Sequence, residues 1–435
     1  MLDLQEPRLN WYDAGQRHLC LPRAGDGAEP LAAVLTHGSR IVLDDERELL
    51  DATAGGGAAC HGFNHPHIGM AVARQLERMP HMPLGAIVHR EPARLAARLA
   101  QLLPGGLDRV IFSESGAAAL EIALGVALEY WTAQGEGSRR KFLAFNGGWH
   151  GATAAASTLG DLPGMRRSAL RKLVSRQFHA HLPADDGKTA ALEALIARHA
   201  DKLAGLVVEP LVQAAGGWKF HDAEVLRRLR AVADRHKLLL IFDECFTGFG
   251  RTGAMFASTL AGVTPDMIVL GKALSGGTLP LAATVVRGDL IEAARPFACA
   301  SAFMGNALAC AAANASLDLF EQEPRLEQAA EIGRQLSAGL APCREFPGVR
   351  DVRVLGAIGV VEFSRLDEPG ALQQRFIDAG LYVKPAGRAV GFTPALTIEP
   401  YELSLLIGSA VKLLHEATRR RSRRRTSPDQ ADLPL

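Results

Sequence analysis

The 435-residue sequence lacks the features that mark membrane, secreted and nucleic-acid-binding proteins. No apolar stretch reaches the roughly 18 residues that a membrane-spanning helix needs, and the N-terminus has no charged start followed by an apolar core. Charge of one sign is not in excess either, because the formal net charge is only +1. The sequence therefore predicts a cytoplasmic protein with small-molecule substrates and with neither a membrane nor a nucleic acid as partner.

Cysteine pairs with a metal-like spacing are also missing. The six cysteines stand at positions 20, 60, 245, 299, 310 and 343, and none of them forms a CxxC pair. Scattered cysteines of this kind are typical of reduced, mostly buried thiols. We therefore expect no metal site.

What the sequence does contain is an alternation of apolar strand-length runs with helical patterns. Hydrophobic residues make up 48% of the chain and charged residues 22%, which suits a large globular enzyme. The expected strands are Arg109–Ser113, Lys141–Phe145, Gly205–Glu209, Leu238–Phe242, Met267–Leu270 and Leu281–Val286, and the expected helices include Ala117–Thr132, Ala190–His199 and Ala223–Lys237. This alternation predicts an α/β fold with a mostly parallel sheet covered by helices on both faces.

We expect this sheet to form a large domain over residues 71–324. Residues 1–70 and 325–418 would together form a smaller α+β domain, with alternating strands near Ile41–Leu43 and Val352–Phe363. Residues 419–435 read RRRSRRRTSPDQADLPL, which predicts a disordered basic tail. A nucleic-acid or membrane-surface role for this run is the alternative to a solvated tail.

An acid and a lysine follow two successive predicted strands. Asp243 comes where Leu238–Phe242 ends, and Lys272 comes two residues after Met267–Leu270. Ligands of open α/β sheets bind at the carboxyl ends of strands. A lysine amine can form a Schiff base with the aldehyde of pyridoxal phosphate, and a carboxylate can keep the pyridine nitrogen protonated. Each residue alone has a simpler explanation, since Asp243 could cap a turn and Lys272 could be a solvated surface lysine.

A G-x-G-x-x-G pattern also occurs, from Gly248 to Gly253. Directly after a strand it would suggest a dinucleotide site, but no acidic residue stands about 20 positions further on after a second strand. We therefore expect these glycines to build a tight loop.

These segments resemble the class III (omega) aminotransferases, a family of fold-type I pyridoxal phosphate enzymes. DECFTGFGRTG (Asp243–Gly253) is similar to the family's aspartate motif, and LGKALSGG (Leu270–Gly277) is similar to its lysine motif. The resemblance extends from Arg17 to Glu416. It is strongest to the members of biotin biosynthesis that use S-adenosylmethionine as amino donor, in the segments Phe303–Leu317, Asp351–Glu362 and His61–Pro66. It implies a homodimer with active sites at the subunit interface.

The resemblance also assigns residues to the cofactor. Trp149, followed by His150, corresponds to the aromatic residue that stacks on the pyridine ring and borders the substrate. Glu209 and Gln213 correspond to residues near the ring and its phenolic oxygen.

The phosphate loop corresponds to Ser115 and Gly116, between a strand and a helix whose amide groups attract anions. Two family hydroxyls are replaced, at Ala117 and at Ala302, the latter expected to face the partner's cofactor. Losing hydrogen bonds worth about 1 kcal/mol each predicts weaker retention of the cofactor.

The pocket for the second substrate departs further. A family tyrosine falls at Arg23, two tryptophans fall at Gly56 and Gly57, and the arginine that binds a carboxylate falls at Lys384. Two lost indoles remove a wall, and lysine offers a point charge in place of a bidentate fork. This predicts a bulkier second substrate than the biotin precursor, anionic if Arg23 lies in the pocket and not in a shifted surface segment.

Three functions agree with these residues. The first is an aminotransferase that takes its amino group from S-adenosylmethionine for a second substrate in specialised metabolism. The second is γ-elimination or replacement on S-adenosylmethionine, which forms a new carbon–carbon or carbon–heteroatom bond with a bulky partner such as a nucleotide. The third is a non-catalytic scaffold, against which the presence of Asp243, Lys272 and Trp149 argues.

Overall fold

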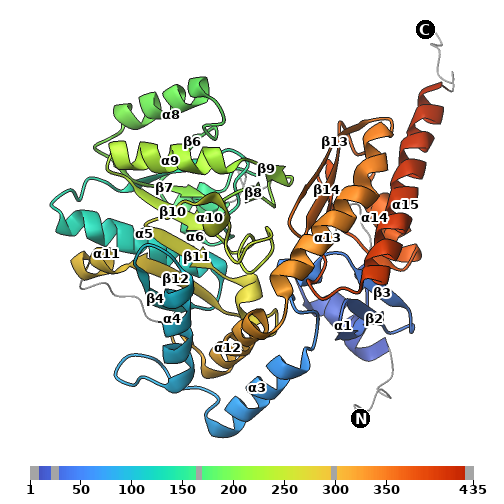
Figure 1. Cartoon of the computed structure of the whole chain (residues 1–435), viewed down its shortest axis with the longest axis horizontal. Helices are drawn as coiled ribbons and strands as arrows, with labels where there is room; N and C mark the ends of the chain where they lie inside the picture. Colours follow the sequence, from blue (N-terminus) through green and yellow to red (C-terminus); the bar gives the residue numbers. More distant parts are fainter. Residues whose placement is uncertain (1–8, 21–28, 163–168, 295–300, 427–435) are drawn as a thin grey trace.

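A seven-stranded sheet is the centre of the larger part of the molecule (Figure 1). The structure, a computed structural model, describes residues 9–20, 29–162, 169–294 and 301–426. In spatial order the strands are β4 (Leu107–Ser113), β12 (Ala282–Arg287), β11 (Met267–Leu270), β10 (Leu239–Asp243), β7 (Leu203–Val208), β5 (Lys141–Phe145) and β6 (Phe178–Ala180). The two pairings of β12 are antiparallel and the other four are parallel. The sheet is thus mostly parallel, as the sequence predicts.

Both faces of this sheet are buried. On β10, Leu240 and Phe242 belong to one apolar cluster, whereas Leu239 and Ile241 belong to another. The first face packs against α4 (Arg90–Leu102), α8 (Asp186–Arg198) and α9 (Ala223–Arg235), and the second packs against α5 (Gly116–Ala133), α6 (Ala154–Leu159) and α11 (Gly288–Ala293). Because side chains alternate along a strand, a continuous apolar run fills both layers.

The two ends of the chain form the smaller part of the molecule together (Figure 1). Here β1 (Ala33–His37), β2 (Arg40–Leu43) and β3 (Glu48–Asp51) are joined by β15 (Leu381–Tyr382), which runs parallel to β3. A second sheet contains β13 (Val349–Leu355), β14 (Ile358–Phe363), β17 (Ala389–Phe392) and β16 (Pro385–Ala386). The helices of this part are α1 (Leu9–His18), α13 (Arg325–Leu340), α14 (Pro369–Asp378) and α15 (Pro400–Thr426), and α3 (Pro66–Arg78) and α12 (Ala307–Gln322) pack against each other beneath both parts.

The smaller part differs from its prediction in three places. Strands are present near Val352–Phe363, as expected, but they are the two arms of an antiparallel hairpin, β13–β14, that turns at Gly356 with a φ of 51°. The expected division after Met70 falls inside α3. Residues 419–426 continue α15, whereas 427–435 lie outside the described residues. Arginine favours helix, so a run of arginines can extend a helix that packing has already formed.

Two further expectations, on membrane-spanning helices and on cysteines, can be compared with the described residues. No helix there is apolar over a sufficient length to cross a bilayer. The five described cysteines are all free, and three of them are buried.

A left-handed turn connects β3 to the rest of the chain. It is the short element α2 (Ala54–Gly57), whose residues Ala54, Gly55, Gly56 and Gly57 have φ values of 48°, 59°, 72° and 87°. The buried carboxylate of Asp51 holds the turn, accepting hydrogen bonds from the amide of Thr53 at 2.7 Å and from that of Gly55 at 2.8 Å. A run of glycines suits this turn because a side chain strains the left-handed backbone.

Replacing Gly56 with alanine should therefore cost about 1 kcal/mol of stability through the backbone alone. An added Cβ at Gly56 meets no atom within 4 Å, so steric contact does not contribute. Gly56→Asn should cost less, because asparagine tolerates this conformation. Thermal unfolding measures the difference, with Gly408→Ala in α15, where a Cβ also meets nothing within 4 Å, as a stabilising control. Equal effects of the two alanine substitutions would contradict a left-handed backbone at Gly56.

Candidate active site

Asp243 and Lys272 lie at the carboxyl ends of adjacent parallel strands. Asp243 is the last residue of β10 and pairs with Val269 of β11. Lys272 begins a 3-10 turn, η3 (Lys272–Ser275), directly after Gly271. Its φ of 45° is left-handed, which is unusual for a lysine and costs energy. Strained backbone of this kind is concentrated at functional sites, so the conformation agrees with a role for Lys272.

A buried ion pair fixes Asp243. Its Oδ2 lies 2.8 Å from Nδ1 of His150, and its Oδ1 accepts a hydrogen bond from the amide of Cys245 at 3.2 Å. Burial opposes charge on both groups, but their hydrogen bond and mutual attraction prevail: the pKa of Asp243 is lowered and that of His150 is raised. The site thus holds a carboxylate in its anionic form away from water.

Glu209 links the loop of Trp149 to this pair. Its carboxylate accepts hydrogen bonds from the amide of Trp149 at 2.8 Å and from that of Ala214 at 3.3 Å. Burial, with the charge of Asp243, raises the pKa of Glu209 to about 7 although His150 acts in the opposite direction. Gln213 is buried in β8 (Val212–Gln213), the next strand along the chain. The structure therefore brings the sequence-predicted residues of the cofactor ring to one edge of the sheet.

The N-terminus of α5 opens on the same cavity as Lys272. Ser115 caps the helix by accepting a hydrogen bond from the amide of Ala118 at 3.2 Å. Ser115, Gly116, Lys272 and Thr278 line a cavity of about 310 Å³. A Cβ added to Gly116 would lie 2.6 Å from Sγ of Cys245, so only glycine fits there. Burial raises the pKa of the Cys245 thiol, which therefore stays neutral beside a site for an anion.

The two alanines at which the resemblance expects hydroxyls lie in different surroundings. Ala117 is packed so closely on Gly151 that a Cβ on that glycine would lie 2.4 Å from the alanine methyl. Ala302 is exposed, and the hydroxyl of the preceding Ser301 donates a hydrogen bond to Glu114, a further lining residue of the cavity. Sequence reasoning missed Ser301, although a hydroxyl one position from Ala302 was a usable signal.

The structure describes some but not all of the residues predicted to bind the second substrate. A Cβ on Gly57 would lie 2.8 Å from Cε2 of Phe246 and 3.9 Å from Cδ of Lys272, whereas Gly56 faces open space. The space that a side chain would take is therefore empty at Gly56, whereas at Gly57 the ring of Phe246 fills it. Sequence reasoning missed Phe246, although it follows Asp243 by only three residues.

Two charged candidates complete this set. Lys384 is exposed just after β15 and has no ion-pair partner among the described residues. Tyr382 of the same strand pairs with Asp51, the residue that caps the glycine turn. Arg23 lies outside the described residues.

The G-x-G-x-x-G segment forms a loop that packs on the smaller part of the chain. Buried Arg251 donates hydrogen bonds to the carbonyl oxygens of Pro394 at 2.7 Å and Ala357 at 3.3 Å. The next helix, α10 (Ala257–Ala261), begins only after this loop. The glycines thus do not open a helix at a strand end, as a dinucleotide fingerprint requires.

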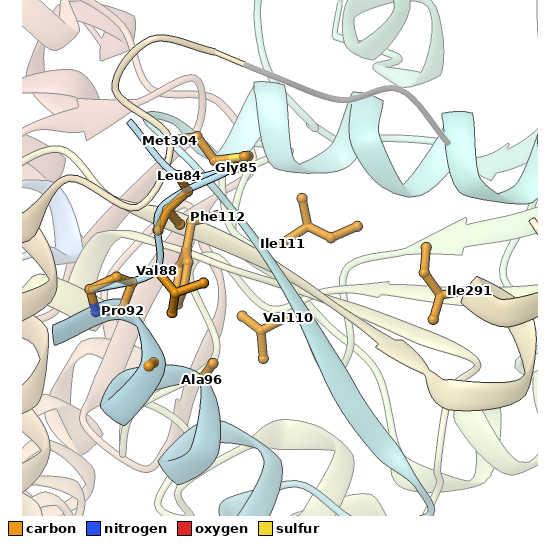
Figure 2. Close-up of a pocket in the computed structure, with 11 residues that line it drawn as sticks. Leu84, Gly85, Val88, Pro92, Ala96, Val110, Ile111, Phe112, Ile291 and Met304 are labelled. Atoms are coloured by element: carbon orange, nitrogen blue, oxygen red, sulfur yellow. The ribbon is translucent and has the colours of Figure 1, made fainter. Parts of the chain in front are cut away.

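A second cavity, of about 420 Å³, contains none of the predicted cofactor residues. Figure 2 shows Phe112 of β4 beside Leu84 and Val88, and Ile111 of the same strand on the side of Ile291. Its lining is apolar, in contrast to the charged surroundings of Lys272.

The first cavity has the groups that pyridoxal phosphate requires. It combines a lysine amine, a helix N-terminus for a phosphate, and glycines at Gly116 and Gly277 where a Cβ would clash at 2.6 Å and 2.8 Å. A buried anionic carboxylate, Asp243, lies nearby at the end of the neighbouring strand. The fold and this site define a pyridoxal phosphate-dependent transferase of fold type I.

Comparison with known proteins identifies the family. Residues 24–414 match the family described as Aminotransferase class-III, so the chain belongs to the class III aminotransferases, which use pyridoxal phosphate. It is 37% identical over 412 residues to adenosylmethionine-8-amino-7-oxononanoate aminotransferase of Mycobacterium leprae, with 91% of this chain and 94% of that protein covered. The expected family, fold class and cofactor are thereby confirmed.

Solved structures agree with this assignment. A pyridoxal phosphate-bound amine transaminase from an uncultivated Pseudomonas species superposes with a TM-score of 0.85 at 30% identity, covering 92% of this chain and 98% of that one. A thermostable omega transaminase variant, in which a tryptophan is replaced by glycine, superposes with a TM-score of 0.90 at 25% identity, covering 94% and 99%. Family membership supports an enzyme over a scaffold.

The contact between Gly116 and Cys245 can be tested by a double substitution. Gly116→Ala should weaken binding of pyridoxal phosphate at least tenfold, because its Cβ would overlap the sulfur at 2.6 Å and displace the start of α5. Adding Cys245→Ala should restore much of the affinity, since it removes the sulfur. Titration of the apoprotein with the cofactor measures both effects. Equal affinities for the single and double variants would show that the contact does not limit the phosphate site.

The raised pKa of Glu209 predicts a pH-dependent stability. Between about pH 4.5 and 7 the folded protein binds more protons at this carboxyl than the unfolded chain does, so its contribution to stability falls as pH rises through this window. Glu209→Gln removes the effect. The thermal midpoint of the variant apoprotein relative to wild type should therefore increase from pH 5 to pH 8, by the equivalent of up to about 3 kcal/mol. A constant difference would mean that Glu209 is already ionised at pH 5.

Proposed function

We propose that this enzyme takes its amino group from S-adenosylmethionine and transfers it to an acceptor bulkier than 8-amino-7-oxononanoate. The observation that carries the proposal is the left-handed glycine turn beside Lys272, which presents no side chain at Gly56. The donor is supported by the name and 37% identity of the Mycobacterium leprae relative. A specialised biosynthetic pathway would be the setting.

The acceptor's bulk is argued from the space at Gly56. Family resemblance assigns indoles to Gly56 and Gly57, and the position of Gly56 has no atom within 4 Å of an added Cβ. The omega transaminase variant with tryptophan replaced by glycine was engineered for the synthesis of bulky amines, which supports the same relation between glycine and substrate size.

The acceptor is also proposed to carry a negative group. Lys384 is exposed near the strand that adjoins the glycine turn, where the family has a carboxylate-binding arginine. A lysine ammonium is a point charge with rotatable donors, so it accepts carboxylate and phosphate groups of varied geometry.

In this proposal each candidate residue has one task. Bound pyridoxal phosphate supplies an aldehyde and an electron-accepting ring. Lys272 would hold the cofactor through its amine and, once displaced by the amine of the substrate, would move the proton of the substrate α-carbon. Asp243, kept anionic by His150, holds the proton of the pyridine nitrogen. Trp149 would cover the ring, and the amides at Ser115 and Gly116, where α5 begins, would bind the phosphate.

The enzyme is further proposed to act as a cytoplasmic homodimer. Large apolar side chains near the apolar cavity are exposed in the single chain, with Val88 at 75%, Phe303 at 55% and Ile87 at 47%. Phe303 adjoins Ala302, which the family resemblance directs to the partner's cofactor. A second copy that covers these side chains would bury them.

The donor is tested by mixing the pyridoxal phosphate-loaded protein with S-adenosylmethionine alone. We expect the cofactor to be converted to its pyridoxamine form and the donor to its keto acid. Absorbance monitors the cofactor, and mass spectrometry detects the keto acid. Lys272→Ala is the control and should show neither change. Release of methylthioadenosine would contradict transamination and would support γ-elimination, the second function that the sequence suggests. No change in S-adenosylmethionine would contradict the donor.

A further inference from the structure

The ring of Phe246 borders the space beside Lys272. Lys272 Nζ lies 5.5 Å from the centroid of this ring. Phe246 is only partly buried, although the strand residues before it on β10 are fully buried. A partly exposed aromatic ring thus lies next to the amine of Lys272.

Two glycines and a tryptophan fix the position of this ring. Trp218 meets it edge to face, with centroids 5.4 Å apart and an interplanar angle of 69°. Gly57 also approaches so closely that a Cβ there would lie 2.8 Å from the ring. Trp218 in turn lies on Gly391 of β17, where a Cβ would be 2.5 Å from its indole. Phe246 therefore cannot move away without disturbing both neighbours.

The smaller part of the chain holds Trp218 in place. Arg353 of β13 donates a hydrogen bond to the carbonyl oxygen of Trp218 at 2.8 Å and another to that of Gly217 at 3.2 Å. The same guanidinium contacts Glu362 of β14 at 2.8 Å. These hydrogen bonds fix the backbone at Trp218. Through Trp218 they orient the ring of Phe246, which remains partly exposed.

We propose that Phe246 is a specificity-determining residue that stacks on a planar, unsaturated ring of the substrate, either an aryl group or a purine. Trp218 and Gly57 keep the ring of Phe246 in position, and the exposed Gly56 next to Gly57 adds no side chain to its surroundings. A flat ring gains from offset stacking on an aromatic face, whereas a saturated ring of equal size does not. The inference rests on the proposed function only in that an amine or its carbonyl product binds beside Lys272.

The test compares two amines of matched size, 1-phenylethylamine and 1-cyclohexylethylamine. The ratio of their kcat/KM values in the half-reaction should fall about fivefold in Phe246→Leu, which keeps an apolar side chain but loses the ring. Phe246→Tyr should keep the wild-type ratio. Phe178→Leu is the matched control, because this residue of the edge strand β6 loses a ring contact with His199 away from the site.

Binding provides a readout that needs no turnover. The dissociation constants of acetophenone and cyclohexyl methyl ketone, measured by ligand-observed NMR on the same proteins, should show the same fivefold change in ratio. Phe246→Leu should also raise KM for S-adenosylmethionine if the purine is the ring that stacks, and leave it unchanged if an aryl group does. Unchanged ratios together with an unchanged KM would overturn the proposal.

The outcomes separate this subsite from the proposed function. If Phe246→Leu changes the ratio of ketone affinities but the enzyme transfers no amine, the subsite stands and the proposed donor and acceptor are refuted. Amine transfer that is indifferent to Phe246 would retain the aminotransferase and refute the subsite. Equal thermal midpoints of Phe246→Leu and Phe246→Tyr would show that altered ratios do not come from partial unfolding.

Discussion

The ion pair between Asp243 and His150 is the interaction around which the site is arranged. A carboxylate at the buried end of a central strand is costly unless a partner compensates its charge. His150 provides this compensation, and the loop that carries it also carries Trp149, whose amide is bound by Glu209. One electrostatic requirement thus fixes the strand end, the loop of Trp149 and a second buried acid.

The parallel sheet converts this local requirement into a site. Since β10 and β11 run parallel with Asp243 opposite Val269, the next strand must deliver Lys272 to the same edge. The antiparallel β12 pairs with β4, after which the chain enters α5, so the N-terminus of α5 lies at this same edge. Residues from four distant stretches meet because the strands that precede them end together.

The sequence predicted the parts of this arrangement that depend on local pattern. Apolar runs identified the strands, so Asp243 and Lys272 could be placed at strand ends, and family likeness added Ser115, Gly116 and Trp149. It did not predict Phe246 or Ser301, because their roles depend on contacts with Gly57 and Glu114 that are remote in the chain. It also interpreted Gly56 and Gly57 as equally open, since a sequence shows a missing side chain but not the neighbour that fills its place. The helix over residues 419–426 escaped prediction because composition alone does not show that α15 is already formed by packing.

The attachment of Trp218 to Arg353 has a consequence for how such an enzyme can diverge. The hairpin that carries Trp218 belongs to the larger part of the chain, whereas Arg353 and Gly391 belong to the smaller part. The residues that hold Phe246 in position therefore come from both parts of the chain, whereas Asp243 and Lys272 both belong to the larger part. Substitutions in the sheet of β13, β14 and β17 can move Trp218, and with it the ring of Phe246, while Asp243 and Lys272 stay in place. Selection can therefore act on the surroundings of Lys272 separately from the residues at the strand ends.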